Sequence, residues 1–253
     1  HANAEERALM NPQALREIQS AELSAVMGPY VGVAIFLLFL WIMIAFCKMP
    51  KASDSDRSLN LGPTLKRLLK NRNYVLGVLA QFFYVGAQIG VWSFTIRYVM
   101  QELHLNEEEA SSYYLAALIL FVLARFVCTG LMKYFSPGQL LSALSLLAIG
   151  CCLGVIYVGG IIGVISLVGI SGCMSLMFPT IYGLAVRGLG EDTKIGGSGL
   201  IMAILGGAVM TALQGQVSDQ TGSINLAYWV PLGCFVTISI YGILHLKERH
   251  QKA

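Results

Sequence analysis

The sequence predicts an all-α integral membrane protein with seven membrane-spanning helices. Of its 253 residues, 56% are hydrophobic and 12% are charged, whereas a soluble domain carries about 25% charged residues. The apolar residues come in runs of about 20, the length of an α-helix that crosses the hydrocarbon core of a bilayer. We place the spans at residues 26–47, 74–100, 111–133, 138–158, 160–186, 195–217 and 225–246.

Basic residues divide unequally between the two sides that these spans define. One side carries the basic linker 48–73, the pair Arg187 and Lys194, and a basic tail at 247–253. On the other side, loop 101–110 is acidic and contains no Lys or Arg. Because Lys and Arg are enriched in cytoplasmic loops, we expect linker 48–73 and the C-terminal tail to be cytoplasmic.

The first 25 residues are polar and contain no apolar stretch that would serve as a signal peptide. We expect residues 1–25 to form a partly helical external loop before the first span. Nothing in this segment would move it across a membrane unaided, so we expect earlier spans that this chain lacks. Span 26–47 is then the last span of an N-terminal bundle.

Linker 48–73 combines a polar loop with a basic amphipathic stretch. In that stretch, Leu65, Leu68 and Leu69 can lie on the lipid headgroups while the neighbouring Lys and Arg residues meet anionic lipid. We therefore expect a helix on the cytoplasmic surface, with control by a regulatory partner as the alternative.

Six spans then follow within residues 74–246, with short connections and a very tight turn at Gly159 and Gly160. The chain thus has one span, then a long basic linker, then six further spans. This order is what the last span of one bundle followed by a complete second bundle would give. Six spans form the repeat unit of the major facilitator fold, in which two units enclose a site near the bilayer midplane. The predicted fold is a C-terminal six-span bundle of this kind plus one preceding span.

The span 74–100 carries polar side chains on one face. Gln81, Tyr84, Gln88 and Trp92 fall in line at about 100° per residue. An unpaired amide in lipid costs on the order of several kcal/mol, so this face must contact protein or a wet cavity. We expect the wall of a substrate cavity, with hydrogen bonds to a neighbouring helix as the alternative. Amides beside aromatic rings suit a neutral polyhydroxy ligand such as a sugar.

No Asp, Glu, Lys or His lies deep within a predicted span, and proton-driven transport normally needs a titratable group there. Any proton carrier is therefore expected outside this chain. Arg125 is the deepest charge and needs a partner. We hypothesise that it pairs with Glu191 or Asp192 and latches the inner gate. The alternative is that Arg125 caps helix carbonyl groups and only holds the fold.

Three further features concern the later spans. Pro179 is expected to kink its helix and to aim Phe178 and Tyr182 at a ligand, although both rings could instead fill the bundle core. The glycines of span 195–217 allow close helix packing, with a role in gating as the alternative. The six cysteines are interpreted as small buried hydrophobic residues without disulfide or metal-site spacing.

Several long segments resemble the fucose:proton symporter family of the major facilitator superfamily. The resemblance covers residues 63–246 and implies a twelve-span transporter that moves a deoxyhexose with a proton by alternating access, with the essential carboxylates in the first half. The segments are AQFFYVGAQIGVWSFTIRY (80–98), ARFVCTG (124–130), FPTIYGLAVRGLGEDTK (178–194) and GQVSDQTG (215–222).

Within this resemblance, Gln81, Gln88 and Trp92 match the family pattern. The related glucose/galactose branch is expected to have an acid at Gln88 and no Trp92, which favours the fucose branch. Phe178 departs from the pattern, because the fucose-transporting members have an aromatic hydroxyl there. This departure puts specificity for L-fucose in doubt.

We therefore expect the C-terminal part of a sugar:proton symporter for L-fucose or a related hexose, in a bacterial inner membrane. It would be a transporter and not an enzyme, with the proton as coupling ion and no other cofactor or metal. Its expected partners are the sugar, the lipid bilayer and the missing N-terminal bundle, and no nucleic acid. Two alternatives stay open: a glucose/galactose transporter of the same family, and a seven-span receptor or sensor.

Overall fold

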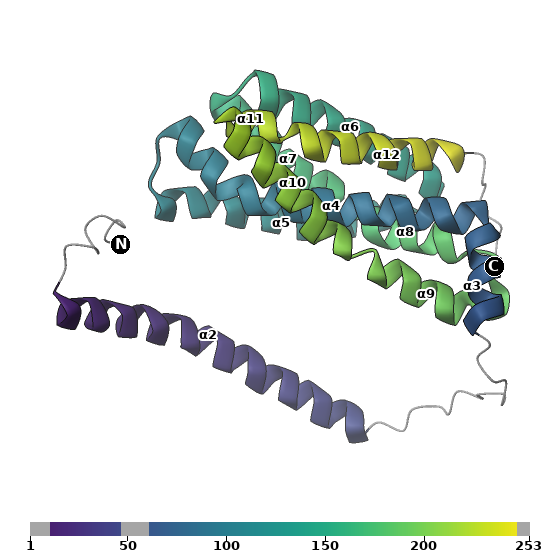
Figure 1. Cartoon of the computed structure of the whole chain (residues 1–253), viewed down its shortest axis with the longest axis horizontal. Coiled ribbons are helices and arrows are strands. Elements are labelled where there is room, and N and C mark those ends of the chain that lie inside the picture. Colours follow the sequence, from purple (N-terminus) through teal and green to yellow (C-terminus); the bar gives the residue numbers. More distant parts are fainter. Residues whose placement is uncertain (1–10, 47–60, 247–253) are drawn as a thin grey trace. The chain divides into compact units, whose positions relative to one another are not determined.

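The structure is a computed structural model that describes residues 11–46 and 61–246, and this part of the chain is almost entirely helical (Figure 1). Seven of its helical stretches are long and apolar enough to cross a membrane. The predicted all-α membrane fold is therefore confirmed. The elements are α2 (Pro12–Phe46), α3 (Leu61–Lys70), α4 (Arg72–Leu103), α5 (Glu107–Leu131), α6 (Pro137–Tyr157), α7 (Gly160–Met174), α8 (Met177–Val186), η1 (Gly190–Asp192), α9 (Thr193–Met202), α10 (Leu205–Thr221), α11 (Ile224–Ala227) and α12 (Trp229–Leu244).

The chain divides into two compact units, residues 1–58 and residues 59–253. The first unit contains α2, whose apolar stretch from Met27 to Phe46 forms the first candidate span. Helix α2 begins at Pro12, so residues 12–25 are helical, in keeping with the partly helical connection predicted for 1–25, of which residues 1–10 lie outside the described part. The expected loop within residues 48–60 and the expected tail at 247–253 lie outside the described residues.

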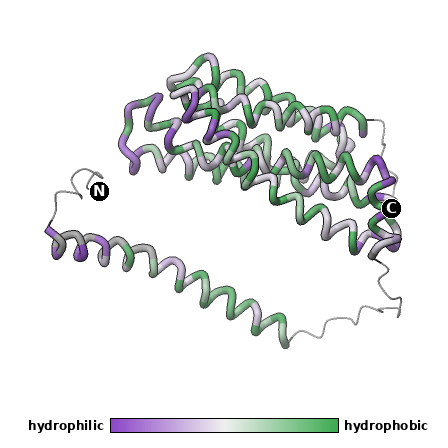
Figure 2. The backbone as a smooth tube through the Cα atoms, viewed as in Figure 1, coloured by the Kyte–Doolittle hydropathy of each residue, from purple (hydrophilic) through white to green (hydrophobic). Residues whose placement is uncertain are grey.

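The second unit is a helical bundle that supplies the other six candidate spans. Three spans are each built from consecutive helical elements: α7 with α8, η1 and α9 with α10, and α11 with α12. Hydrophilic residues gather at the two ends of this bundle, and the middle of each helix is mostly hydrophobic (Figure 2). Helix α3 lies at one end, which we call the α3 end, and α11 lies at the other, the α11 end (Figure 1).

Capping residues account for where two of these helices begin. Asn106 accepts a hydrogen bond from the backbone N–H of Glu109, whose side chain bonds back to the Asn106 N–H. Ser136 and Gln139 make the same reciprocal pair at the start of α6. This capping box satisfies backbone donors that a helix start leaves free. It explains why α5 begins at Glu107, four residues before the predicted start of the span at 111.

The expected tight turn between α6 and α7 is present at Gly159 and Gly160. Both residues adopt positive φ angles, 63° and 54°, which glycine tolerates without a steric penalty. The Glu102 carboxylate accepts a hydrogen bond from the backbone N–H of Gly160 and another from the side-chain amide of Asn225. One carboxylate thus ties together the end of α4, this turn and α11.

Helix α4 is the centre of the bundle and contacts α5, α7, α8, α10 and α12. Its closest approach to α10 occurs at Gly206, where an added Cβ would lie 1.9 Å from the carbonyl oxygen of Phe82. Gly86 of α4 fits against Met210 in the same interface. Small residues permit this backbone contact between helices in lipid, which is the packing role expected for the glycines of this span.

A polar network ties α4, α8 and α12 together at the α3 end. Asn73 donates from its amide nitrogen to the Leu184 carbonyl oxygen, and its amide oxygen lies 2.6 Å from Nε2 of His245. The other ring nitrogen of His245 lies 2.8 Å from the carbonyl oxygen of Tyr241. His245 is buried at the end of α12, so this network fixes α12 against α4.

Candidate functional site

A cluster of aromatic and guanidinium groups lies midway along the bundle, where α4, α5 and α7 meet. The Trp92 indole N–H donates to Oγ of Ser171 over 3.2 Å. The Trp92 ring meets Phe121 edge to face at 5.2 Å between centroids. Arg125 also packs on Phe121, with its guanidinium carbon 5.3 Å from the centre of the Phe121 ring. We call Trp92, Phe121 and Arg125 the central cluster, and Gln88, one turn from Trp92 on α4, borders it.

The helix break between α7 and α8 lies next to this cluster, and Phe178 follows the break. Its ring packs against Tyr84 at 6.0 Å between centroids. Pro179 lacks a backbone N–H, so the Ser175 carbonyl four residues earlier has no helical donor. The Nε–H of Arg125 donates to that carbonyl oxygen over 3.0 Å. The interruption predicted from Pro179 is thus present. Arg125 caps a helix carbonyl group, which is the alternative role that the sequence left open for it.

We call the four polar-face residues of α4, Gln81, Tyr84, Gln88 and Trp92, the polar stripe. Two of them lie inside the bundle and do not line an open cavity. Gln81 and Tyr84 are both fully buried, because α8 packs over this part of α4. The Tyr84 hydroxyl donates to the Met174 carbonyl oxygen over 3.0 Å, at the same helix break. Tyr84 thus bonds a neighbouring helix, whereas the amide of Gln81 has no hydrogen-bond partner among the described residues.

The other two residues of the stripe are more accessible. Gln88 lies one turn from both Tyr84 and Trp92 on the same face of α4, and Gln88 and Trp92 are half-buried. Their side chains can therefore meet a ligand without the bundle opening. The four residues therefore divide into a buried pair, Gln81 and Tyr84, and a half-exposed pair, Gln88 and Trp92.

Tyr182 does not join the central cluster. It packs with Leu68 and Tyr74 in a separate hydrophobic group nearer the α3 end, and its hydroxyl lies close to Gly197 of α9. Phe178 and Tyr182, one helical turn apart on α8, thus have different neighbours, and a shared ligand for the two rings stays a prediction.

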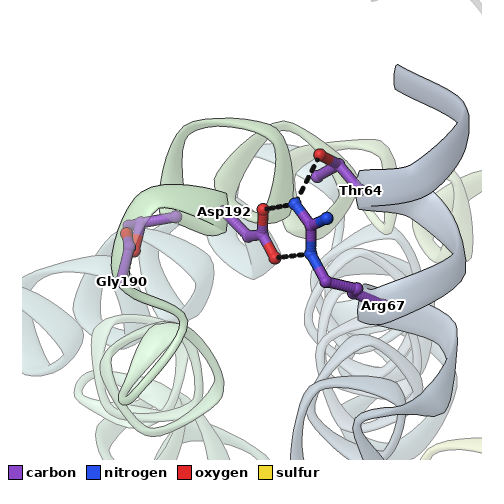
Figure 3. Close-up of polar contacts among 5 residues, drawn as sticks. Thr64, Arg67, Gly190 and Asp192 are labelled. Carbon is purple, nitrogen blue, oxygen red and sulfur yellow. Dashed lines mark hydrogen bonds and ion pairs between the residues drawn. The ribbon is translucent and has the colours of Figure 1, made fainter. Parts of the chain in front are cut away.

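Asp192 pairs with Arg67 of α3, which the sequence did not indicate (Figure 3). Nε and Nη2 of Arg67 donate to the two carboxylate oxygens over 2.9 and 2.6 Å, and Nη2 also donates to Oγ1 of Thr64 over 3.0 Å. The hydrogen bond to Asp192 and the charge of that carboxylate raise the pKa of Arg67, with a smaller contribution from the charge of Glu191. A bidentate pair of this kind fixes orientation as well as contributing energy. In this structure Asp192 is therefore engaged by Arg67, and the pairing of Arg125 with Glu191 or Asp192 stays a prediction.

The sequence also missed Phe121, Ser171 and Thr64. Two of them carried a usable signal, because residues three or four apart share a helix face: Phe121 stands four residues before Arg125, and Thr64 stands three before Arg67. Ser171 carried none, since its role depends on how α7 packs against α4.

Together with Gln88, the central cluster can bind a neutral polar ligand. A half-buried amide offers a donor and an acceptor, the guanidinium offers further donors, and the aromatic rings offer apolar faces. Such a site combines hydrophobic walls with a small number of placed polar groups, as small-molecule sites generally do.

Comparison with known proteins places the chain in a family. Residues 23–209 match the model of the Major Facilitator Superfamily. The L-fucose-proton symporters of Haemophilus influenzae and Escherichia coli are 36% and 34% identical over 89% and 92% of this chain. A glucose/galactose transporter of Brucella abortus is 31% identical over 90% of the chain.

The structures agree with the sequences. The crystal structure of the transporter FucP in the outward conformation superposes with a TM-score of 0.82 at 33% identity, covering 100% of this chain and 61% of that one. The chain spans about half the length of the curated relatives it matches, 54% for both symporters. These relatives are named as transporters, which supports the prediction of a transporter over that of an enzyme or a receptor. The expected resemblance is confirmed, and the chain belongs to the Major Facilitator Superfamily.

Proposed function

We propose that this chain is the C-terminal part of a sugar:proton symporter that works by alternating access in a bacterial inner membrane. The observation that carries the proposal is the central cluster, in which an indole and a guanidinium meet the ring of Phe121, with the half-buried amide of Gln88 one turn away on α4. The L-fucose-proton symporters that match about nine-tenths of the chain support the same activity. The sugar would be L-fucose or a related hexose.

In this proposal, Gln88 and Trp92 bind the sugar, while Arg125 holds the wall on which they lie. The Asp and Glu residues of the described spans lie at helix ends, as Glu102 does at the end of α4. We therefore place the proton-binding carboxylate on the N-terminal bundle of the longer protein. The α3 end, which carries most of the basic residues, would face the cytoplasm, together with the C-terminus.

The test is proton uptake driven by sugar in vesicles that contain the full-length transporter. We expect Gln88→Ala to abolish uptake while the protein level in the membrane stays unchanged. The exposed Gln101→Ala, on the same helix near its end, is the matched control and should transport normally. Uptake that persists when the proton gradient is collapsed would refute the symport.

A glucose/galactose transporter is the second candidate, because relatives with that name are 31% identical. Competition by L-fucose, D-arabinose, L-galactose, glucose and galactose separates the two candidates. Phe178→Tyr supplies the aromatic hydroxyl found in the fucose-transporting members, so we expect it to strengthen competition by L-fucose relative to glucose. An opposite change in the ranking would favour the glucose/galactose assignment.

A further inference from the structure

Helix α3 packs one of its faces against the bundle and leaves the rest uncovered. Leu68 is 1% exposed and lies in a hydrophobic group with Tyr74 and Leu200. Leu65 and Leu69 are 53% and 64% exposed. Since residues four apart share a helix face, the two exposed leucines form one apolar strip that points away from the bundle.

Two lysines border this strip. Lys66 and Lys70 each directly follow one of the exposed leucines, and both are exposed. At about 100° per residue, the two lysines form a second strip beside the leucines. An apolar strip next to a basic strip is the arrangement of helices that lie in the interface of a membrane.

Arg67 fixes which way these strips point. Its guanidinium bonds both carboxylate oxygens of Asp192 and the Thr64 hydroxyl, while Leu68 fills the contact below it. These two contacts define the rotation of α3 about its axis in this structure. The sequence alone had assigned Leu68 and Arg67 to the lipid-facing side, and the structure turns both toward the bundle.

We propose that the α3 surface, formed by Leu65, Lys66, Leu69 and Lys70, binds anionic phospholipid at the cytoplasmic face of the membrane. Helix α3 runs across the direction of α4 at the end of the bundle (Figure 1), which is where headgroups would lie. Charge complementarity selects the lipid, because basic residues near an anionic bilayer surface are attracted to it. Two leucines give too little apolar area for a stable protein interface but suffice for shallow insertion among headgroups.

This inference rests on the proposed function only for the side of the membrane to which α3 is assigned. Lipid binding can be measured on the purified chain, without a sugar, a proton gradient or a defined topology. Failure of transport and failure of lipid binding are therefore separate results.

The experiment counts the lipids that remain bound to the chain after extraction from mixed phosphatidylglycerol and phosphatidylethanolamine bilayers, by native mass spectrometry. The wild-type chain should retain phosphatidylglycerol preferentially. Lys66→Gln and Lys70→Gln should each lower that preference about fivefold, as the attraction of one basic residue to an anionic surface implies. Replacing both lysines by arginine should preserve it.

Two further variants keep the test decisive. Lys133→Gln removes an exposed lysine at the same end of the bundle that lies outside the α3 surface, so it should lower the preference less than either α3 variant. Leu65→Gln together with Leu69→Gln should reduce retention of both lipids, and circular dichroism should show that each variant stays helical. The proposal is overturned if the lysine variants keep the wild-type preference, or if Lys133→Gln loses as much as they do.

Discussion

The guanidinium of Arg125 donates to the carbonyl oxygen of Ser175 over 3.0 Å, and so replaces the backbone donor that Pro179 lacks. In a continuous helix, the N–H of residue 179 would bond to that oxygen. The preceding carbonyl, that of Met174, is bonded by the Tyr84 hydroxyl. Neighbouring helices therefore satisfy the backbone groups that the break between α7 and α8 exposes, as a membrane interior requires.

The first prediction concerns the coupling between Arg125 and Pro179. We expect Arg125→Gln to lower the free energy of unfolding by roughly 1–3 kcal/mol, the contribution of a hydrogen bond to a charged group. In the Pro179→Ala background the loss should be smaller, because the alanine N–H can bond to the Ser175 carbonyl. Unfolding of the detergent-solubilised chain by SDS measures both values.

The double-mutant cycle isolates the pairwise effect. Simple additivity of the two substitutions would contradict the role that we assign to Arg125. A large loss for Arg125→Gln in both backgrounds would point instead to the contact with Phe121, which does not depend on Pro179.

The second prediction concerns the packing of α10 on α4. An added methyl group at Gly206 would meet the Phe82 carbonyl oxygen at 1.9 Å, so Gly206→Ala should force the two helices apart. We expect a loss of about 1–3 kcal/mol in the free energy of unfolding, as for other overpacked cores. Gly215→Ala is the matched control on the same helix, because an added Cβ there has nothing within 4 Å.

Gly215→Ala should leave stability unchanged or raise it slightly, since alanine favours the helix. Equal losses for the two variants would show that general helix properties dominate and that the close contact at Gly206 does not.

The third prediction separates the two halves of the polar stripe on α4. Tyr84→Phe removes the hydroxyl that bonds the Met174 carbonyl, so it should lower stability by about 1 kcal/mol and leave the ranking of competing sugars unchanged. Trp92→Phe removes the donor to Ser171 in the half-exposed part and should weaken sugar uptake. Measurements of sugar uptake and thermal stability for both variants test this division of the stripe into a structural and a sugar-binding half. A change in the ranking of competing sugars caused by Tyr84→Phe would contradict it.

Much of the fold follows from the sequence because bilayer thickness sets the length of each span, and apolar runs reveal it. The turn at Gly159 and Gly160 and the break at Pro179 were also predictable, since each depends on local backbone chemistry. The boundary at Glu107 was readable too, through the spacing of Asn106 and Glu109. These features need no knowledge of which helix lies next to which.

The site was less predictable because a helical face shows only that its residues point the same way. Gln81 and Gln88 share a face, yet the first is fully buried and the second is half-exposed. The partner of Asp192 likewise depends on where α3 lies, and Arg67 is 125 residues away in the chain. Contacts between distant elements of this kind leave no local signal.

The last prediction concerns the carboxylate of Glu102, which accepts hydrogen bonds from the Gly160 N–H and the Asn225 amide. Glu102→Gln replaces one acceptor oxygen by an NH2 donor, so one of these two donors must lose its partner. Hydrogen exchange of the turn at Gly160 should then become faster, and the melting temperature should fall. Glu108→Gln, an exposed residue at the same end of the bundle, should change neither. If exchange at the turn is as slow in Glu102→Gln as in the wild type, the positive φ angles of the two glycines hold this turn without the carboxylate.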